Sequence, residues 1–150
     1  MHSFFRVVIL LLLTVAVKAD TFNFTFTGEN FGASGILTGH LVSPGVYQIT
    51  QITGTMTDYK ESPLDQIWGL YPVGEINGAD NLLFTTKPFV DSLGINFLVS
   101  DLSGLRLAHD NLGYMITGCY EGSCSDNNRI TNRGDLVVHL RFPNPQPCSS

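Results

Sequence analysis

An aromatic segment near the middle of the chain is the first stretch whose residue types could bind a sugar. Trp68 and Tyr71 lie in the apolar run 67–71, which ends at Pro72 and Gly74. Aromatic side chains beside glycine and proline can form the floor of a ligand groove, but a tryptophan in such a run more often belongs to the core. We therefore expect Trp68 to be buried, and we keep a glycan-binding surface at Trp68 and Tyr71 as the alternative.

Carboxylates around this segment offer a second chemistry. Glu61, Asp65 and Glu75 could supply the acid pair of a glycosidase, although any chain of this size offers several carboxylates. Three histidines lie in or beside expected strands: His40, His109 and His139. Such histidines are mostly surface or hydrogen-bonded residues, and no serine lies in a G-x-S-x-G motif. We name no catalytic residue and expect a non-catalytic protein, with a small secreted hydrolase as the alternative.

The tripeptide Arg133-Gly134-Asp135 resembles the motif of adhesion ligands that bind integrins. This resemblance implies an exposed loop in which the arginine and the aspartate point apart and meet different receptor subunits. Asp126-Asn127-Asn128 and Asn132 predict such a loop. A plain turn into the next strand is the alternative, since chance gives the tripeptide in about 2–3% of chains this long. Cell adhesion through Arg133, Gly134 and Asp135 is the second functional alternative.

Three cysteines, Cys119, Cys124 and Cys148, suggest disulfide chemistry in an oxidising compartment. Cys119 and Cys124 flank a four-residue segment, and a turn at Gly122 would bring their sulfurs within disulfide reach. The two pairings that use Cys148 stay open, as does a bond from Cys148 to another chain. No second pair of ligands accompanies the 119/124 spacing, so we expect no zinc site.

Asp80, Asp110 and Asp126 each stand beside an asparagine and could offer oxygen ligands to calcium. No known calcium-loop spacing matches, and Asp-Asn pairs are ordinary turn chemistry. We therefore expect no metal and no cofactor. Asn23-Phe24-Thr25 is the only N-glycosylation sequon, and its asparagine is expected on the outward face of a strand.

Residues 1–19 have the features of a secretory signal peptide, with Arg6, an apolar run and small residues at Val17 and Ala19. The run of about 11 residues is shorter than the roughly 20 that span a bilayer, so we expect cleavage before Asp20 and no stable membrane anchor. Loss of Arg6 and Lys18 lowers Lys plus Arg from 8 to 6 while all 13 acidic residues remain, which gives a mature net charge of −7. This charge argues against nucleic acid as a partner.

Period-two alternation predicts the elements that position these residues. Phe22, Phe24 and Phe26 alternate with polar residues, which indicates a half-buried strand. A break is expected at 32–35, and the long run 46–59 changes parity, which predicts a bulge near Thr50-Gln51 or a bend at Gly54. Strands at 82–84 and 95–99 are expected to pair as a hairpin inside a larger sheet.

About nine short strands and no amphipathic helix follow from this pattern. The predicted fold class is all-β, an antiparallel β-sandwich or barrel of about 8–10 short strands after the signal peptide. The predicted organisation is a signal peptide at 1–19, a single domain at 20–142 and a Pro-rich exposed tail at 143–150.

Three segments resemble a recurring pattern of small secreted β-proteins that include many bacterial exosortase-sorted (PEP-CTERM) proteins: residues 49–55, 79–84 and 88–97. The resemblance implies an exported all-β protein and carries no general activity, so no functional residue is transferred. The chain ends in PNPQPCSS and lacks the sorting tail of that group. The expected function is that of a secreted, non-catalytic extracellular protein of binding or matrix type, whose partner is an extracellular glycan, matrix or cell-surface receptor.

Overall fold

The computed structural model describes residues 18–58, 65–75, 78–100, 102–120 and 129–141. Several predictions fall on residues outside these ranges: the signal peptide apart from Lys18 and Ala19, Glu61, residues 126–128, the Pro-rich tail, and two cysteines, Cys124 and Cys148. The side chain of Cys119 is also outside the description. The disulfide, leader and tail therefore stay predictions.

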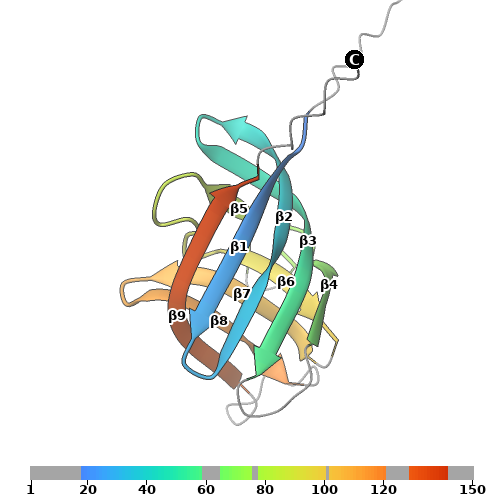
Figure 1. Ribbon diagram of the computed structural model, residues 1–150, viewed down its shortest axis with the longest axis vertical. Coiled ribbons are helices and arrows are strands. Elements are labelled where there is room, and N and C mark those ends of the chain that lie inside the picture. Colours follow the sequence, from blue (N-terminus) through green and yellow to red (C-terminus); the bar gives the residue numbers. More distant parts are fainter. Residues whose placement is uncertain (1–17, 59–64, 76–77, 101, 121–128, 142–150) are drawn as a thin grey trace, which may run out of the picture.

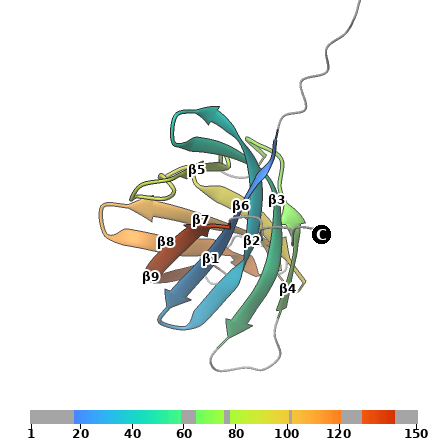
Figure 2. The same cartoon turned by 45° about the horizontal axis from the view of Figure 1, so that its top comes forward.

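Nine antiparallel strands make up the described part of the chain: β1 (Asp20–Gly28), β2 (Phe31–Ser43), β3 (Val46–Asp58), β4 (Asp65–Leu70), β5 (Leu82–Phe84), β6 (Ile95–Val99), β7 (Leu102–Asp110), β8 (Gly113–Tyr120) and β9 (Arg129–Leu140). Their order is β2-β1-β9-β8-β7-β6-β4-β3-β5, and β2 also pairs with β3. Eight strands thereby close into a barrel, and β5 is added beside β3 (Figures 1 and 2). The predicted all-β class is confirmed, in its barrel form.

The interior of the barrel is filled by aromatic and branched side chains. In β1 the three phenylalanines are buried, while Asn23, Thr25 and Thr27, each one residue after a phenylalanine, are exposed. Alternation in β1 thus places one face in the core and the other in solvent, as predicted. The largest fully buried side chains are Phe24, Phe26, Phe97, Leu37, Ile49, Ile52, Leu83, Ile95, Leu105, Leu107, Ile116 and Leu136.

A β-bulge in β3 resolves the parity change of that strand. Ile49 and Ile52 are both buried although they differ in parity, because Thr50 is an extra residue between the pairs Thr38–Gln51 and Gly39–Ile49. The predicted bulge at this position is confirmed. The break expected at 32–35 is wrong, since all four residues pair with β3 inside β2.

The expected hairpin between 82–84 and 95–99 is also wrong. β5 pairs with the first residues of β3, whereas β6 lies between β4 and β7. Both strands exist at the predicted positions, but each hydrogen-bonds to another neighbour. The two are linked instead through Asn81, whose backbone N–H donates to the carbonyl of Gly94 at 3.0 Å.

Asn81 ties three parts of the barrel together from a fully buried position with φ of 54°. Its side-chain amide donates to the carbonyl of Tyr71 at 2.8 Å, and its side-chain oxygen accepts from the N–H of Asn96 at 2.9 Å. Its own carbonyl accepts from the N–H of Ile49 at 2.9 Å. Asparagine tolerates this left-handed conformation better than most residues. The side chain of Asn81 therefore joins the end of β4 to the start of β6, and its backbone carbonyl adds the first part of β3.

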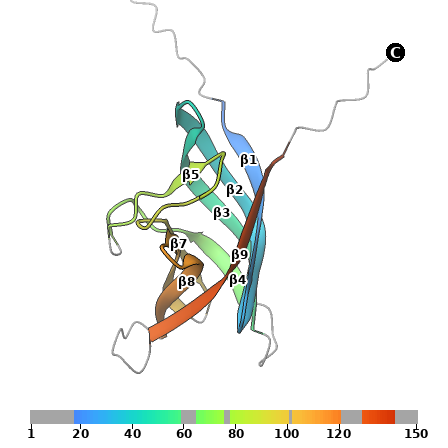
Figure 3. The ribbon, with the colours of Figure 1, turned by 90° about the vertical axis from the view of Figure 1, so that its left-hand side faces the viewer.

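Strand β9 changes partner at Gly134. It pairs with β8 up to Gly134 and with β1 from Gly134 to Leu140, so it runs obliquely from one side of the barrel to the other (Figure 3). A Cβ on Gly134 would lie 2.1 Å from the carbonyl oxygen of Thr27, so only glycine fits this close crossing. Beyond Gly134, the described strands leave β9 with a partner on one edge only.

Candidate binding face on the barrel exterior

The outward side of β1, β2 and β3 carries a set of short hydroxyl and amide side chains, here called the hydroxyl face: Asn23, Thr25, Thr27, Ser34, Thr53, Thr55 and Thr57. Pairing places Thr25, Ser34 and Thr55 in one row across the three strands. Neighbouring strands are about 4.8 Å apart, so the hydroxyls form a regular array. No charged side chain belongs to this set.

A shallow open hollow of ≈ 210 Å³ lies on these strands. It is lined by Thr25, Phe26, Thr27, Gly32, Ala33, Ser34, Thr55 and Thr57. Gly32 has no side chain in the row between Thr27 and Thr57, which leaves space between the two hydroxyls. The hollow thus combines an apolar floor at Phe26 and Ala33 with hydroxyl groups around it, an arrangement that an uncharged ligand with both apolar and polar surface could contact.

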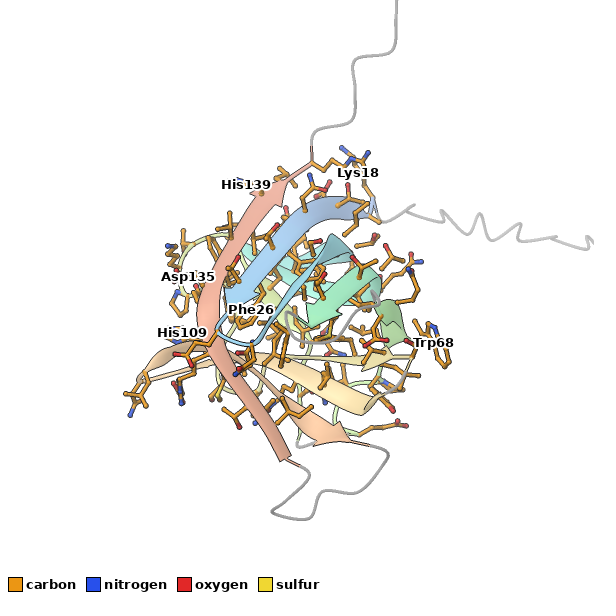
Figure 4. All side chains as sticks on the ribbon, turned by 60° about the horizontal axis from the view of Figure 1, so that its bottom comes forward. Lys18, Phe26, Trp68, His109, Asp135 and His139 are labelled. Carbon is orange, nitrogen blue, oxygen red and sulfur yellow. The ribbon has the colours of Figure 1, made fainter. Side chains whose placement is uncertain are left out.

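Trp68 is exposed, and the expectation that it belongs to the core is wrong. Its residue surface is 65% exposed, while the preceding Ile67 is only 5% exposed and fills the core position. Against β6, Trp68 is the extra residue of a bulge between Ile67–Val99 and Gly69–Leu98. Bulges re-aim side chains and often occur beside functional sites. Figure 4 shows the indole projecting from the side of the barrel.

The position of Trp68 is at the border of the hydroxyl face. Gln66, two residues earlier and on the same side of β4, stands opposite Thr55 of β3. Trp68 is therefore next to the end of the hydroxyl rows. Tyr71 follows β4 and is half-buried; its backbone N–H donates to the carbonyl of Asn96 at 3.0 Å. Tyr71 thus anchors the end of β4, and the exposed aromatic of the predicted pair is Trp68.

The tripeptide at 133–135 lies in the middle of β9, and the exposed loop predicted for it is wrong. Asn132, taken as part of that loop, is 1% exposed and donates to the carbonyl of Phe31 at 2.9 Å. Residues i and i+2 of a strand project on the same side, so Arg133 and Asp135 do not point apart. Figure 4 places Asp135 far from Trp68 on the barrel. This geometry is unlike the presentation that the adhesion resemblance implies.

Arg133 is held by a bidentate ion pair with Asp110, at the end of the β7–β8 hairpin. Its two terminal nitrogens donate to the two carboxylate oxygens at 2.8 and 2.7 Å. These hydrogen bonds, assisted by one from the N–H of Leu112, hold the pKa of Asp110 well below its ordinary value. The pair joins β9 to the hairpin beside it.

The ion pair predicts how stability depends on pH. Because the folded pKa of Asp110 is depressed, its contribution is complete above the unfolded value of about 3.9 and is lost as pH falls toward the folded pKa. We expect Asp110→Asn to lower the free energy of unfolding by a constant amount between about pH 5 and 7, and the gap to the wild type to narrow below about pH 4. Urea unfolding of both proteins from pH 7 to pH 2.5 measures this. A gap that stays constant down to pH 2.5 would contradict it.

The groups considered for catalysis lie apart from the hollow. Asp65 accepts a hydrogen bond from the hydroxyl of Ser100 at 2.9 Å, and Glu75 is exposed in the turn after β4. His109 lies edge-on to the ring of Tyr114, with centroids 4.8 Å apart. His139 is exposed on β9, and Figure 4 places it on the opposite side of the barrel from Trp68. None of these groups lines the hollow.

The calcium candidates have other roles in the described structure. Asp110 pairs with Arg133, and Asp80 accepts a hydrogen bond from the N–H of Leu82 at 3.2 Å. Burial raises the pKa of Asp80, and the neighbouring Asp91 carboxylate raises it further. In the described ranges no group of three or more His, Cys, Asp or Glu is arranged to hold a metal ion. Asp126 lies outside these ranges.

Asn23 is exposed on β1, on the outward face where it was expected. A glycan there would not enter the core, and its presence stays a prediction. Asn23 stands opposite Ile36 on one side and His139 on the other. Any glycan at Asn23 would therefore occupy one border of the hydroxyl face.

The fold and this face together define a class of protein: a small, closed antiparallel β-barrel with a filled interior and a hydroxyl-rich exterior with an exposed tryptophan at its border. Across the residues that the structure describes, no helix is long and apolar enough to cross a membrane. No protein-family model, curated protein or solved structure matches the chain. The resemblance to exosortase-sorted proteins therefore stays a prediction.

Proposed function

We propose that this protein is a secreted, non-catalytic extracellular protein that binds a neutral polysaccharide through the hydroxyl face and Trp68. The observation that carries the proposal is the exposed indole at a bulge of β4, the strand that pairs with the last strand of the hydroxyl face. The expected leader at 1–19 supports export.

The chemistry of the face suits a sugar. A pyranose ring has an apolar C–H face that can stack on an indole and a rim of hydroxyls that needs hydrogen-bond partners. Threonine hydroxyls can both donate and accept, and the stiff χ1 of threonine limits the rotamer entropy lost on binding. Trp68 is 65% exposed, so the apolar face of its indole is accessible to a sugar ring.

Charge favours a neutral glycan over a sulfated or carboxylated one. The hollow is lined by no cationic side chain, and the mature chain expected after cleavage has a net charge of −7. A polyanionic ligand would be repelled and would find no arginine or lysine on this face to pair with. The hydrolase alternative has less support, because the hollow is lined by hydroxyl, aromatic and small residues with no carboxylate or histidine.

The proposal predicts that Trp68→Ala weakens binding to neutral polysaccharides at least about 10-fold, or roughly 1.4 kcal/mol. Trp68→Phe should retain part of the affinity, since a smaller aromatic face remains for stacking. A glycan array followed by affinity electrophoresis measures this. Leu112→Ala is the control, because Leu112 is 77% exposed on the distant β7–β8 hairpin.

A second pair of variants tests the hydroxyls separately from the indole. Thr55→Val removes one hydroxyl from the central row at nearly constant volume and should weaken binding several-fold. Thr131→Val makes the same change on an exposed residue of β9 that does not belong to the hydroxyl face, and should have no effect. Absence of binding to every neutral polysaccharide, or equal affinity of Trp68→Ala and wild type, would reject the proposed function.

A further inference from the structure

The second half of β9 has an open backbone edge. The N–H of Arg141 donates to the carbonyl of Thr21 at 2.7 Å, so the odd-numbered residues of this half hydrogen-bond to β1. In an antiparallel pair the residues between them point their N–H and C=O groups to the other side. These are Leu136, Val138 and Leu140. Since β8 pairs only up to Gly134, the described strands provide no backbone partner for these three residues.

This edge lacks three of the features that usually prevent pairing between molecules. Proteins block exposed edges with lysine, proline, bulges or a covering loop. Residues 135–140 contain no lysine, no proline and no register shift against β1. Val137 is 46% exposed and Leu140 is 41% exposed, so the edge also carries apolar side chains into solvent.

An apolar hollow of ≈ 70 Å³ lies beside the same edge, between β9 and the turn after β5. It is lined by Phe22, Phe84, Thr85, Phe89, Val138 and Leu140. A strand added to β9 would direct every second side chain toward this hollow. The inserted strand should therefore have apolar residues at alternate positions, which is the pattern of β9 itself at Leu136, Val138 and Leu140.

We propose that two copies of this chain form a symmetric dimer by antiparallel pairing of their β9 edges about Val138. In a two-fold pairing centred there, Leu136 stands opposite Leu140 of the second copy, and about six backbone hydrogen bonds form. On the outward face the same register places Asp135 of each copy opposite Arg141 of the other, so the dimer has two such contacts. Both residues are exposed and opposite in charge. The edge is thus complementary to itself in hydrogen bonds, apolar side chains and charge.

The dimer brings the two hydroxyl faces onto one continuous sheet surface, because β9 is adjacent to β1 in each copy. A long polysaccharide could contact both faces, which would raise the apparent affinity by avidity. The pairing itself does not depend on sugar binding, so the dimer and the proposed function can fail separately. An edge of this length makes a small interface, and a Kd in the micromolar to millimolar range is expected.

Sedimentation equilibrium tests whether the dimer forms. Protein concentrations up to about 1 mM are needed because the interface is small. The wild type should show reversible dimerisation. Val138→Pro removes an N–H that points to the open edge and leaves the hydrogen bonds between β9 and β1 intact, so the variant should fold, as circular dichroism can verify. Its dimerisation should be at least about 10-fold weaker than that of the wild type. A wild type that stays monomeric, or a folded Val138→Pro that dimerises as the wild type does, overturns the proposal and directs attention to another partner or surface.

A charge exchange tests the register independently. Asp135→Arg alone places arginine opposite arginine, and Arg141→Asp alone places aspartate opposite aspartate, so each variant should dimerise less than the wild type. A mixture of the two should recover dimers, since both contacts of the mixed pair are then attractive. Recovery in the mixture cannot arise from misfolding of either variant. Failure of the mixture to recover dimers would reject the proposed register.

Discussion

Replacing Asn81 by alanine is expected to lower the free energy of unfolding by about 3–5 kcal/mol. The substitution removes two side-chain hydrogen bonds, one to the half-buried carbonyl of Tyr71 and one from the buried N–H of Asn96. Each buried group left unsatisfied costs about 1–3 kcal/mol. Alanine also adopts the left-handed conformation at φ of 54° less readily than asparagine, which adds about 1 kcal/mol.

Asn81→Gly separates the two contributions. Glycine accepts the left-handed backbone without strain but makes neither side-chain hydrogen bond, so it should be about 1 kcal/mol more stable than the alanine variant. Urea unfolding monitored by circular dichroism measures both variants. Equal stability of Asn81→Ala and wild type would mean that the link between β4 and β6 does not depend on this side chain.

Gly35→Ala is expected to destabilise the barrel by about 3 kcal/mol or more. A Cβ at this position would lie 1.9 Å from the carbonyl oxygen of Thr53 and 2.7 Å from the Cα of Gly54. Both obstacles are backbone atoms of the paired strand, so the clash can be relieved only by moving β2 away from β3. That pairing closes the barrel, and its distortion would affect the whole sheet.

Gly69→Ala is the matched control for this effect. Gly69 also lies within a strand, but its added Cβ would have no described atom within 4 Å. The change should be neutral or slightly stabilising, because alanine loses less backbone entropy on folding. Thermal unfolding of the two variants distinguishes close strand contact from a general intolerance of the sheet to glycine replacement. Similar melting temperatures would contradict the steric explanation.

The local alternation of side chains was sufficient to predict the strands but not their partners. The phenylalanines of β1 and the parity change around Thr50 are visible in the sequence, and both are confirmed. The hairpin expected around Asn81 failed because short apolar segments carry no information on which edge they join. β5 pairs with β3, more than thirty residues earlier, rather than with the next strand.

The candidate site was only partly predictable for the same reason. Trp68 was identified as a possible sugar contact, but Ile67 and Trp68 are both apolar, and the sequence does not show which of the two faces the core. Thr25, Ser34 and Thr55 are far apart in the sequence and form a row only through the register of three strands. The asparagines near the tripeptide indicated a loop, yet Asn132 is buried because its amide binds the backbone of Phe31.

The pairing of β1 with β9 has a consequence for how the chain reaches its native state. These strands are separated by nearly the whole described sequence, and their contact must form against the entropy of a very long loop. Topologies dominated by such distant contacts fold slowly, on a scale of milliseconds to seconds. During synthesis β1 has no β9 to pair with until the ribosome has released the last strand. β1 can pair with β2 before then, but the barrel that buries its three phenylalanines cannot close, so apolar surface of the nascent chain stays accessible to chaperones.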